Sequence, residues 1–201
     1  MNLRILLITA GILLVGIAAV LIGTQVFESN RPFNGSLIEP SPPAVDFTLT
    51  DSKGSQYNLA ERKGQVVLIF FGYANCPDVC PATLAEMRNV HTELGEKASE
   101  VDFVFVTVDP QRDSKEDIER YVSSFSDSFI GLSGEEEELQ TVWDGYWVFR
   151  EKQESDSAAG YLMAHTSRVY AVDKAGKLRL TFPFGVSAAS ILDDVQRLLA
   201  E

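Results

Sequence analysis

Both cysteines of the chain lie in one hexapeptide, Cys-Pro-Asp-Val-Cys-Pro, as Cys76 and Cys80. If a helix begins near Cys76, four residues turn the chain by about 400°, and both sulfurs point to nearly one side. A helix N-terminus lowers the pKa of a thiol, because its free N–H groups and its dipole stabilise the thiolate. Two thiolates so placed form a soft ligand pair that suits Cu(I) or Zn(II).

The residues of this motif leave three roles open. One is a structural disulfide outside the cytoplasm, but a bridge across one helical turn closes a tiny loop and stabilises little. Another is a redox-active dithiol, although thioredoxin-like motifs have two residues between their cysteines and this one has three. The last is a metal site, which needs at least one further ligand.

Only two histidines are available to complete a metal site. His91 follows Cys76 by 15 residues, about 22 Å along a helix, so it is expected to pack or to face solvent. His165 is expected in a loop just before a strand at 168–172, where it can face the end of the strand that precedes Cys76. Two thiolates and an imidazole are a three-coordinate set that Cu(I) accepts, and Cu(II) can add a ligand. A structural zinc site would want a fourth protein ligand, for which no candidate stands out.

Alternating strands and helices are predicted to position these residues. The run 66–71 is continuously apolar, as in a strand buried on both faces, and it ends just before the cysteine motif. The other predicted strands are 47–49, 57–59, 101–108, 168–172 and 178–182. The predicted helices are 81–97, 114–125, a short one from about 133, and 187–199, with Ser114 and Ser187 as N-caps. This order predicts an α/β fold with a mixed sheet between helices.

The first 23 residues are predicted to be a transmembrane anchor. Residues 5–23 contain one polar side chain, Thr9, and as a helix they would reach about 28 Å, close to the thickness of the bilayer core. Arg4 and the amino terminus precede this run, which places the N-terminus in the cytoplasm. The alternative is a cleaved signal peptide, whose apolar core would be shorter and would end at a small-x-small site.

The rest of the chain is predicted to lie outside the membrane. Residues 24–43 are rich in Pro, Ser and Asn and are predicted to be a flexible tether. Residues 44–201 contain 15 basic and 27 acidic side chains, a net charge of −12, which disfavours binding to nucleic acid. We therefore expect a single-pass protein of the bacterial inner membrane with its domain on the extracytoplasmic side.

Three motifs follow one another along the chain. They are Phe70-Phe71-Gly72-Tyr73 with the cysteine hexapeptide, Val108-Asp109-Pro110-Gln111-Arg112-Asp113, and His165-Thr166. Together they resemble the Sco/SenC family of copper chaperones, over about residues 40–200. The resemblance implies a membrane-tethered, thioredoxin-like domain that delivers copper to the copper A centre of cytochrome c oxidase, or keeps its thiols reduced. It also implies that Cys76, Cys80 and His165 are the copper ligands.

Two positions depart from the family pattern. Asn75 stands where relatives often have histidine, and Ala164 stands where relatives often have aspartate before the ligand histidine. The missing aspartate is expected to alter the orientation of the imidazole and therefore the copper affinity. Asp78 and Asp109 are candidates for groups that surround the ligands, and the alternative for Asp109 is a simple turn residue.

Two functions follow from the motifs. The first is a copper-binding assembly factor without turnover, which holds Cu(I) or Cu(II) and serves cytochrome c oxidase or another copper or thiol-redox protein. The alternative is a thiol-disulfide oxidoreductase or peroxidase, in which one thiolate attacks a partner disulfide and the other resolves it. His165 discriminates between them, because copper needs an imidazole and dithiol exchange does not. A Cys76–Cys80 disulfide is expected to exclude copper.

Overall fold

The structure is a computed structural model that describes residues 11–13, 16–17, 31–155 and 160–201. The chain divides into two compact units, Met1–Phe33 and Asn34–Glu201. Among the described residues, no helix has the length and apolar character needed to cross a membrane. Most of the predicted anchor lies outside the described residues.

An eight-stranded mixed sheet forms the centre of the second unit, in the order β1-β10-β9-β4-β5-β6-β2-β3. Its strands are β1 Ser36–Leu37, β2 Thr48–Asp51, β3 Gln56–Asn58, β4 Val66–Gly72, β5 Val101–Thr107, β6 Ile130–Ser133, β9 Arg168–Val172 and β10 Leu178–Pro183. The central strand β4 pairs in parallel with β5 and antiparallel with β9. Every residue of β4 is buried, which confirms the prediction from its continuous apolar run.

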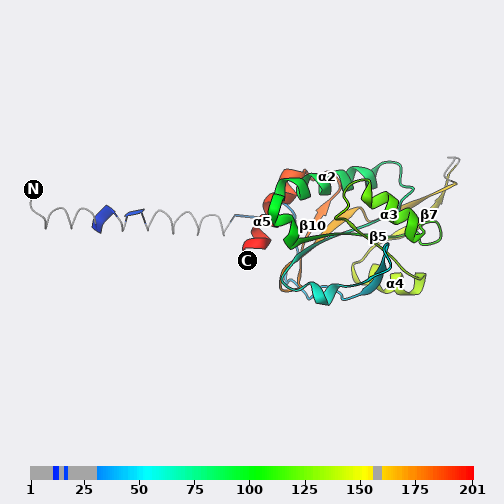
Figure 1. The fold of residues 1–201 in the computed structure, drawn as a ribbon, viewed down its shortest axis with the longest axis horizontal. Coiled ribbons are helices and arrows are strands. Elements are labelled where there is room, and N and C mark those ends of the chain that lie inside the picture. The colour runs from blue at the N-terminus through cyan, green and yellow to red at the C-terminus, as the bar shows by residue number, and fades with distance from the viewer. Residues whose placement is uncertain (1–10, 14–15, 18–30, 156–159) are drawn as a thin grey trace, which may run out of the picture. The chain divides into compact units, whose positions relative to one another are not determined.

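Helices cover both faces of this sheet (Figure 1). The helices α2 Val79–Leu94, α3 Lys115–Ser123 and α5 Ala188–Ala200 lie on one side, and α4 Glu136–Gly145 lies on the other. Two short 3-10 helices, η1 Leu59–Arg62 and η2 Gly95–Glu100, complete the unit. The predicted N-caps Ser114 and Ser187 are confirmed, because each side chain accepts a hydrogen bond from the backbone three residues later. The expected mixed sheet between helices is therefore present.

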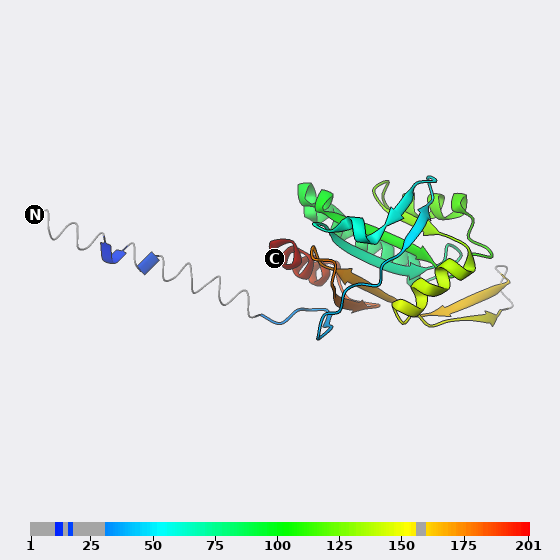
Figure 2. The same ribbon diagram turned by 90° about the horizontal axis from the view of Figure 1, so that it is seen from below.

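A separate two-stranded sheet extends from the domain (Figure 2). It pairs β7 Arg150–Glu154 with β8 Tyr161–His165. The sequence pattern does not predict this hairpin, because the charged run of β7 shows no apolar alternation. His165 is the last residue of β8, so it lies at a strand end and not in the predicted loop.

The compact unit begins earlier than predicted. Residues 34–43 were expected to belong to the flexible tether, but β1 pairs with β10 within this stretch. Asn34 donates its backbone N–H and its side-chain amide to Oδ1 of the buried Asp194 on α5, both at 3.0 Å. The N–H of Gly35 donates to the other carboxylate oxygen at 2.7 Å. A two-residue strand among prolines and serines has no periodic pattern, so sequence analysis could not detect it.

Candidate metal centre

The cysteine loop begins where β4 ends, at Gly72. A Cβ atom at this position would lie 2.8 Å from the ring of Phe105 and 3.0 Å from the sulfur of Cys80. Both distances are below ordinary van der Waals contact, so glycine allows the loop to pass close to the buried thiol. The loop is also tied to the end of β5, because the N–H of Val108 donates to the Gly72 carbonyl at 2.8 Å.

The helix that follows the loop begins at Val79, two residues before the predicted range 81–97, and does not extend back to Cys76. Cys76 precedes Pro77, and a residue before proline is disfavoured in the helical conformation. Asp78 is the N-cap, but its exposed side chain makes no capping hydrogen bond. The two cysteines therefore do not share a helix face. Cys76 lies before the helix, and Cys80 lies in its first turn.

Both cysteines are free thiols, and they differ in exposure and in charge. Cys80 is fully buried and Cys76 is partly exposed. The pKa of Cys76 is lowered to about 4 by hydrogen bonds from the Cys80 thiol, His165 and the backbone N–H groups of Asp78 and Cys80, which outweigh burial. The Cys80 N–H lies 3.4 Å from the Cys76 sulfur. The pKa of Cys80 is raised, because its thiol donates to Cys76 and is buried beside it. Cys76 is therefore the thiolate at neutral pH.

His165 directs one ring nitrogen to the cysteines. Its Nε2 lies 3.5 Å from the sulfur of Cys80, and its Nδ1 lies 3.2 Å from the carbonyl oxygen of Thr166. A carbonyl can only accept, so Nδ1 donates to it, and Nε2 is the ring nitrogen that faces the cysteines and could bind a metal. The Thr166 carbonyl thus orients the imidazole, a role that the side chain of Ala164 cannot take. Phe70 and Tyr73 contact the ring edge to face, at 6.3 and 5.8 Å between centroids.

Cys76, Cys80 and His165 together form a cluster that could hold a metal ion. Their ligand atoms all lie within 4.8 Å of one another. Two sulfurs and an imidazole nitrogen are soft ligands, which favour Cu(I) over a hard cation such as Mg²⁺. Tyr73 is buried beside the cluster, and burial with the neighbouring Cys76 raises its pKa to about 12. This phenol therefore remains neutral at physiological pH.

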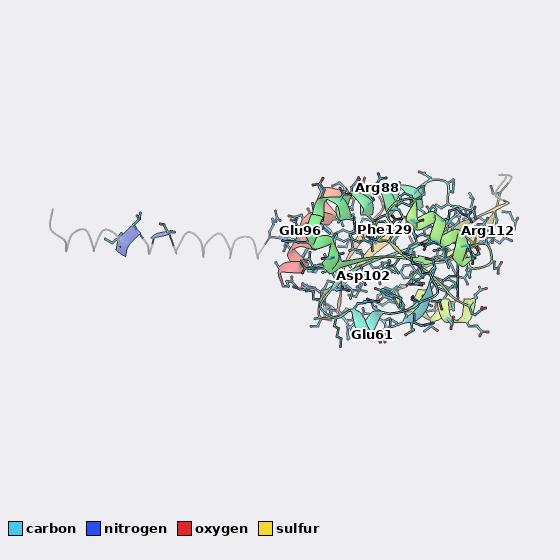
Figure 3. The ribbon with its side chains drawn as sticks, in the orientation of Figure 1. Glu61, Arg88, Glu96, Asp102, Arg112 and Phe129 are labelled. Carbon is cyan, nitrogen blue, oxygen red and sulfur yellow. The ribbon has the colours of Figure 1, made fainter. Side chains whose placement is uncertain are left out.

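Asp109 is buried, and it binds the hairpin. Its Oδ1 accepts from the hydroxyl of Tyr161 at 2.8 Å, and its Oδ2 accepts from Nε of Arg112 at 2.5 Å. Arg112 in turn donates to the Tyr161 carbonyl at 2.8 Å, and its guanidinium carbon lies 3.5 Å above the Tyr161 ring. Figure 3 labels Arg112 at this end of the domain. Since Tyr161 begins the strand that ends at His165, we call these three residues the hairpin lock.

Sequence analysis did not assign a role to Asp113, although it is the last residue of the second motif. Its buried carboxylate accepts from the N–H of Ala74, at 3.2 and 3.3 Å, and from the hydroxyl of Thr107 at 2.7 Å. Burial raises the pKa of Asp113 to about 6. Asp113 therefore connects the end of β5 to the cysteine loop.

His91 is remote from this cluster. Its ring lies against Phe103 and Phe129, at 5.3 and 6.2 Å between centroids, and Figure 3 labels Phe129. The two phenylalanine rings stack on each other at 5.2 Å. The prediction that His91 packs, and does not reach the cysteines, is confirmed.

Comparison with known proteins identifies the family. The SCO1/SenC family model matches residues 37–200. The chain belongs to the SCO1/SenC family. An SCO2-like protein of Rickettsia prowazekii is 31% identical over 188 residues, which cover 90% of each chain. The human mitochondrial SCO1 homolog is 35% identical over 133 residues, covering 65% of this chain and 44% of the relative.

Solved structures of Sco proteins share the fold of this SCO1/SenC chain. Bradyrhizobium japonicum ScoI with copper bound has a TM-score of 0.71 at 35% identity, covering 78% of this chain and 99% of its own. Apo Sco1 from Thermus thermophilus has a TM-score of 0.74 at 35% identity, covering 85% and 99%. The predicted thioredoxin-like α/β fold and the predicted family are therefore confirmed.

Proposed function

We propose that this SCO1/SenC chain binds one copper ion through Cys76, Cys80 and His165 and acts in the assembly of cytochrome c oxidase. The observation that carries the proposal is the convergence of the three ligand atoms within 4.8 Å. Sco proteins of Bradyrhizobium japonicum, Arabidopsis thaliana and yeast with copper bound support the choice of metal. A further solved relative, BsSco, is described as a member of the Sco family of cytochrome c oxidase assembly proteins.

The protonation states suit the uptake of Cu(I). Cys76 already offers a thiolate, His165 directs its Nε2 to the cysteines, and Cys80 must release its proton when the ion binds. Cys76 is the more exposed sulfur, so the thiolate of a partner reaches the ion from that side. Copper then passes to the copper A centre of the oxidase by exchange of ligands, which keeps the ion coordinated throughout.

The proposed location completes this function. We place the anchor at residues 1–23 in the bacterial inner membrane and the copper-binding domain on the extracytoplasmic side. The run of 19 residues at 5–23 with one polar side chain supports an anchor of this kind. In this arrangement the tether consists of residues 24–33, because the compact unit begins at Asn34.

A second function is favoured by the asymmetry of the two thiols. An exposed thiolate at Cys76 beside a buried thiol at Cys80 is the arrangement that dithiol exchange requires. The Cys76 thiolate would attack a partner disulfide and form a mixed disulfide, and one partner sulfur would leave. Cys80 would then displace the second partner sulfur, so the partner gains two electrons and this chain becomes the Cys76–Cys80 disulfide.

Copper stoichiometry of the reduced full chain tests the first function. We expect one copper per chain, a large loss of affinity in His165→Ala, and near wild-type affinity in the matched control His91→Ala. Reduction of a model disulfide by the same variants tests the second function, because that reaction does not need the imidazole. If His91→Ala weakened copper binding more than His165→Ala, the ligand assignment would be wrong.

A further inference from the structure

Exposed aromatic side chains gather close to the metal-site histidine. Within residues 34–155 and 160–201, the large aromatic side chains that stay exposed are Trp147, Phe149 and Phe184, at 70, 58 and 51%. Aromatic residues normally contribute most when buried, because each removes a large apolar area from water. Their concentration at one place on the surface therefore marks an interaction site more strongly than single exposed residues would.

The two phenylalanines flank the turn that follows His165. Phe149 donates its N–H to the hydroxyl of Thr166 at 2.9 Å, and its carbonyl accepts from the Thr166 N–H at 3.0 Å. Phe184 donates its N–H to the carbonyl of Ser167 at 3.1 Å. These hydrogen bonds hold Phe149 and Phe184 beside the turn whose Thr166 carbonyl orients the imidazole.

Trp147 is held outward by its backbone. Buried and exposed residues alternate here: Tyr146 and Val148 are buried, whereas Trp147 and Phe149 face the solvent. The φ of Trp147 is 52°, in the left-handed region. That conformation is unfavourable for a residue with a side chain and is concentrated at functional sites. Within the domain, the exposed indole gains little packing that would offset this cost.

A hollow opens on the other side of the same turn. It has a volume of about 150 Å³, and its lining includes Ser167, Phe184 and Ala82, the last of which lies two residues after Cys80. An apolar cavity of about 150 Å³ accepts a group the size of benzene. The hollow therefore has room for one aliphatic or aromatic side chain of another molecule. Glu86 places a carboxylate in its lining.

We propose that Trp147, Phe149, Phe184 and this hollow, together the aromatic collar, are the docking surface for the protein that receives copper. This inference rests on the proposed function, because ligand exchange requires the partner's thiolates to reach the ion while the chain still holds it. A partner that does so covers the face on which Cys76 is exposed. The copper ligands of the partner would be flanked by apolar side chains, and one of these side chains would fill the hollow.

The charge of the domain indicates which kind of partner surface would fit the aromatic collar. Residues 44–201 carry a net charge of −12, Asp78 is exposed next to Cys76, and Glu86 lines the hollow. A partner face with lysine and arginine around an apolar centre would be attracted and oriented by this field. A membrane surface with anionic lipids would be repelled by the same charge. We therefore infer that the partner is a protein whose docking face has a basic rim.

Copper transfer to two acceptors tests the collar. The full chain in detergent is loaded with one Cu(I) and mixed with the apo copper A domain of the oxidase from the same organism, or with the small chelator bathocuproine disulfonate. We expect Phe149→Ser and Phe184→Ser to slow transfer to the protein by about thirtyfold, the size of an interface hot spot. Transfer to the chelator, which needs no docking, should stay near the wild-type rate. Leu37→Ser, an exposed apolar residue on β1, is the matched control and should change neither rate.

Quenching of tryptophan fluorescence by acrylamide provides an independent readout. Trp143 is fully buried, so quenching reports on the exposed Trp147. We expect the apo copper A domain to protect Trp147. The proposal would be overturned if the copper A domain did not protect Trp147 from the quencher, while lipid vesicles or a higher concentration of the chain itself did. Equal transfer rates for wild type and both phenylalanine variants would also overturn it. A wild-type chain that binds no copper would refute the proposed function, and the quenching result would then decide the collar separately.

Discussion

The hydroxyl of Tyr161 lies 2.8 Å from Oδ1 of Asp109, and this contact joins the hairpin that carries His165 to the end of β5. The hairpin forms a sheet of its own and has no strand pairing with the main sheet in the described part of the chain. The hairpin lock therefore helps to fix the position of a proposed copper ligand whose strand does not pair with the main sheet.

Removal of the Tyr161 hydroxyl is expected to weaken copper binding without removing a ligand. Tyr161→Phe leaves the buried Asp109 carboxylate with one partner fewer, and we expect the copper affinity to fall about five- to thirtyfold, since such a hydrogen bond contributes about 1–2 kcal/mol. Tyr57→Phe is the matched control, because the Tyr57 hydroxyl donates to Asp102 at 3.0 Å, far from the cysteines. Competition with a Cu(I) chelator measures both variants. Equal affinities in the two would show that the lock does not position His165.

Selective alkylation should reveal which cysteine is ionised. The pKa of Cys76 is about 4, whereas that of the buried Cys80 is raised. We expect iodoacetamide to modify Cys76 of the reduced apo chain at a nearly constant rate from pH 6 to 8, with Cys80 spared. Mass spectrometry of the peptides identifies the modified residue. In Cys80→Ala the rate should rise with pH across this range, because the largest cause of the low pKa of Cys76 is lost. A rate that already rises tenfold per pH unit in the wild type would contradict this assignment.

Oxidation should control copper loading. A Cys76–Cys80 disulfide removes both thiolates, so the oxidised full chain is expected to take up almost no Cu(I) while its fold stays intact. Addition of a reductant should restore one copper per chain. Free-thiol titration and circular dichroism before copper is added separate this effect from unfolding. Undiminished uptake by the fully oxidised protein would rule out the thiolates as ligands.

The stability of the reduced apo chain should depend on pH through Asp113. Burial raises its pKa to about 6, while an unfolded aspartate titrates near 3.9. Between these values the folded state holds a proton that the unfolded state has lost, so stability from this group falls as the pH rises from about 4 to about 6. We expect this loss to amount to about 1–3 kcal/mol.

Asp113→Asn should remove that loss, since the amide does not titrate. Urea unfolding at several pH values between 4 and 7 measures the slope of the unfolding free energy against pH. Asp127→Asn, at an exposed position, is the control and should keep the wild-type slope. A wild-type slope in Asp113→Asn would mean that another group causes the pH dependence.

The parts of the site that could be predicted depended on rare residue types and on local patterns. The chain has two cysteines and two histidines, so few combinations existed, and the helical distance from Cys76 excluded His91. The apolar run of β4 and the serine caps of α3 and α5 are local signals, and the structure bears them out.

The missed parts depend on contacts between distant segments. Both sides of the strand β7 are largely exposed, so its side chains can be charged and show no apolar alternation. The strand forms because β8 pairs with it. Asp113 acts on Ala74, 39 residues earlier, and such a bond leaves no local pattern. The predicted helix 81–97 starts two residues later than α2, which begins at Val79, and the alternative of a helix from Cys76 does not occur, because a residue before proline is disfavoured in the helical conformation.

In the proposed membrane-anchored arrangement, the bonds from Asn34 and Gly35 to Asp194 would limit the distance between the copper site and the membrane. With an anchor that ends at residue 23, ten residues lead to Asn34, and a chain of ten residues spans at most about 35 Å. The predicted tether of 20 residues would have doubled that reach. The shorter tether would confine the domain to a thin layer above the bilayer and would raise the local concentration of any acceptor held in the same membrane. Copper transfer would then be a search in two dimensions, set by lateral diffusion and by the height at which the acceptor presents its ligands.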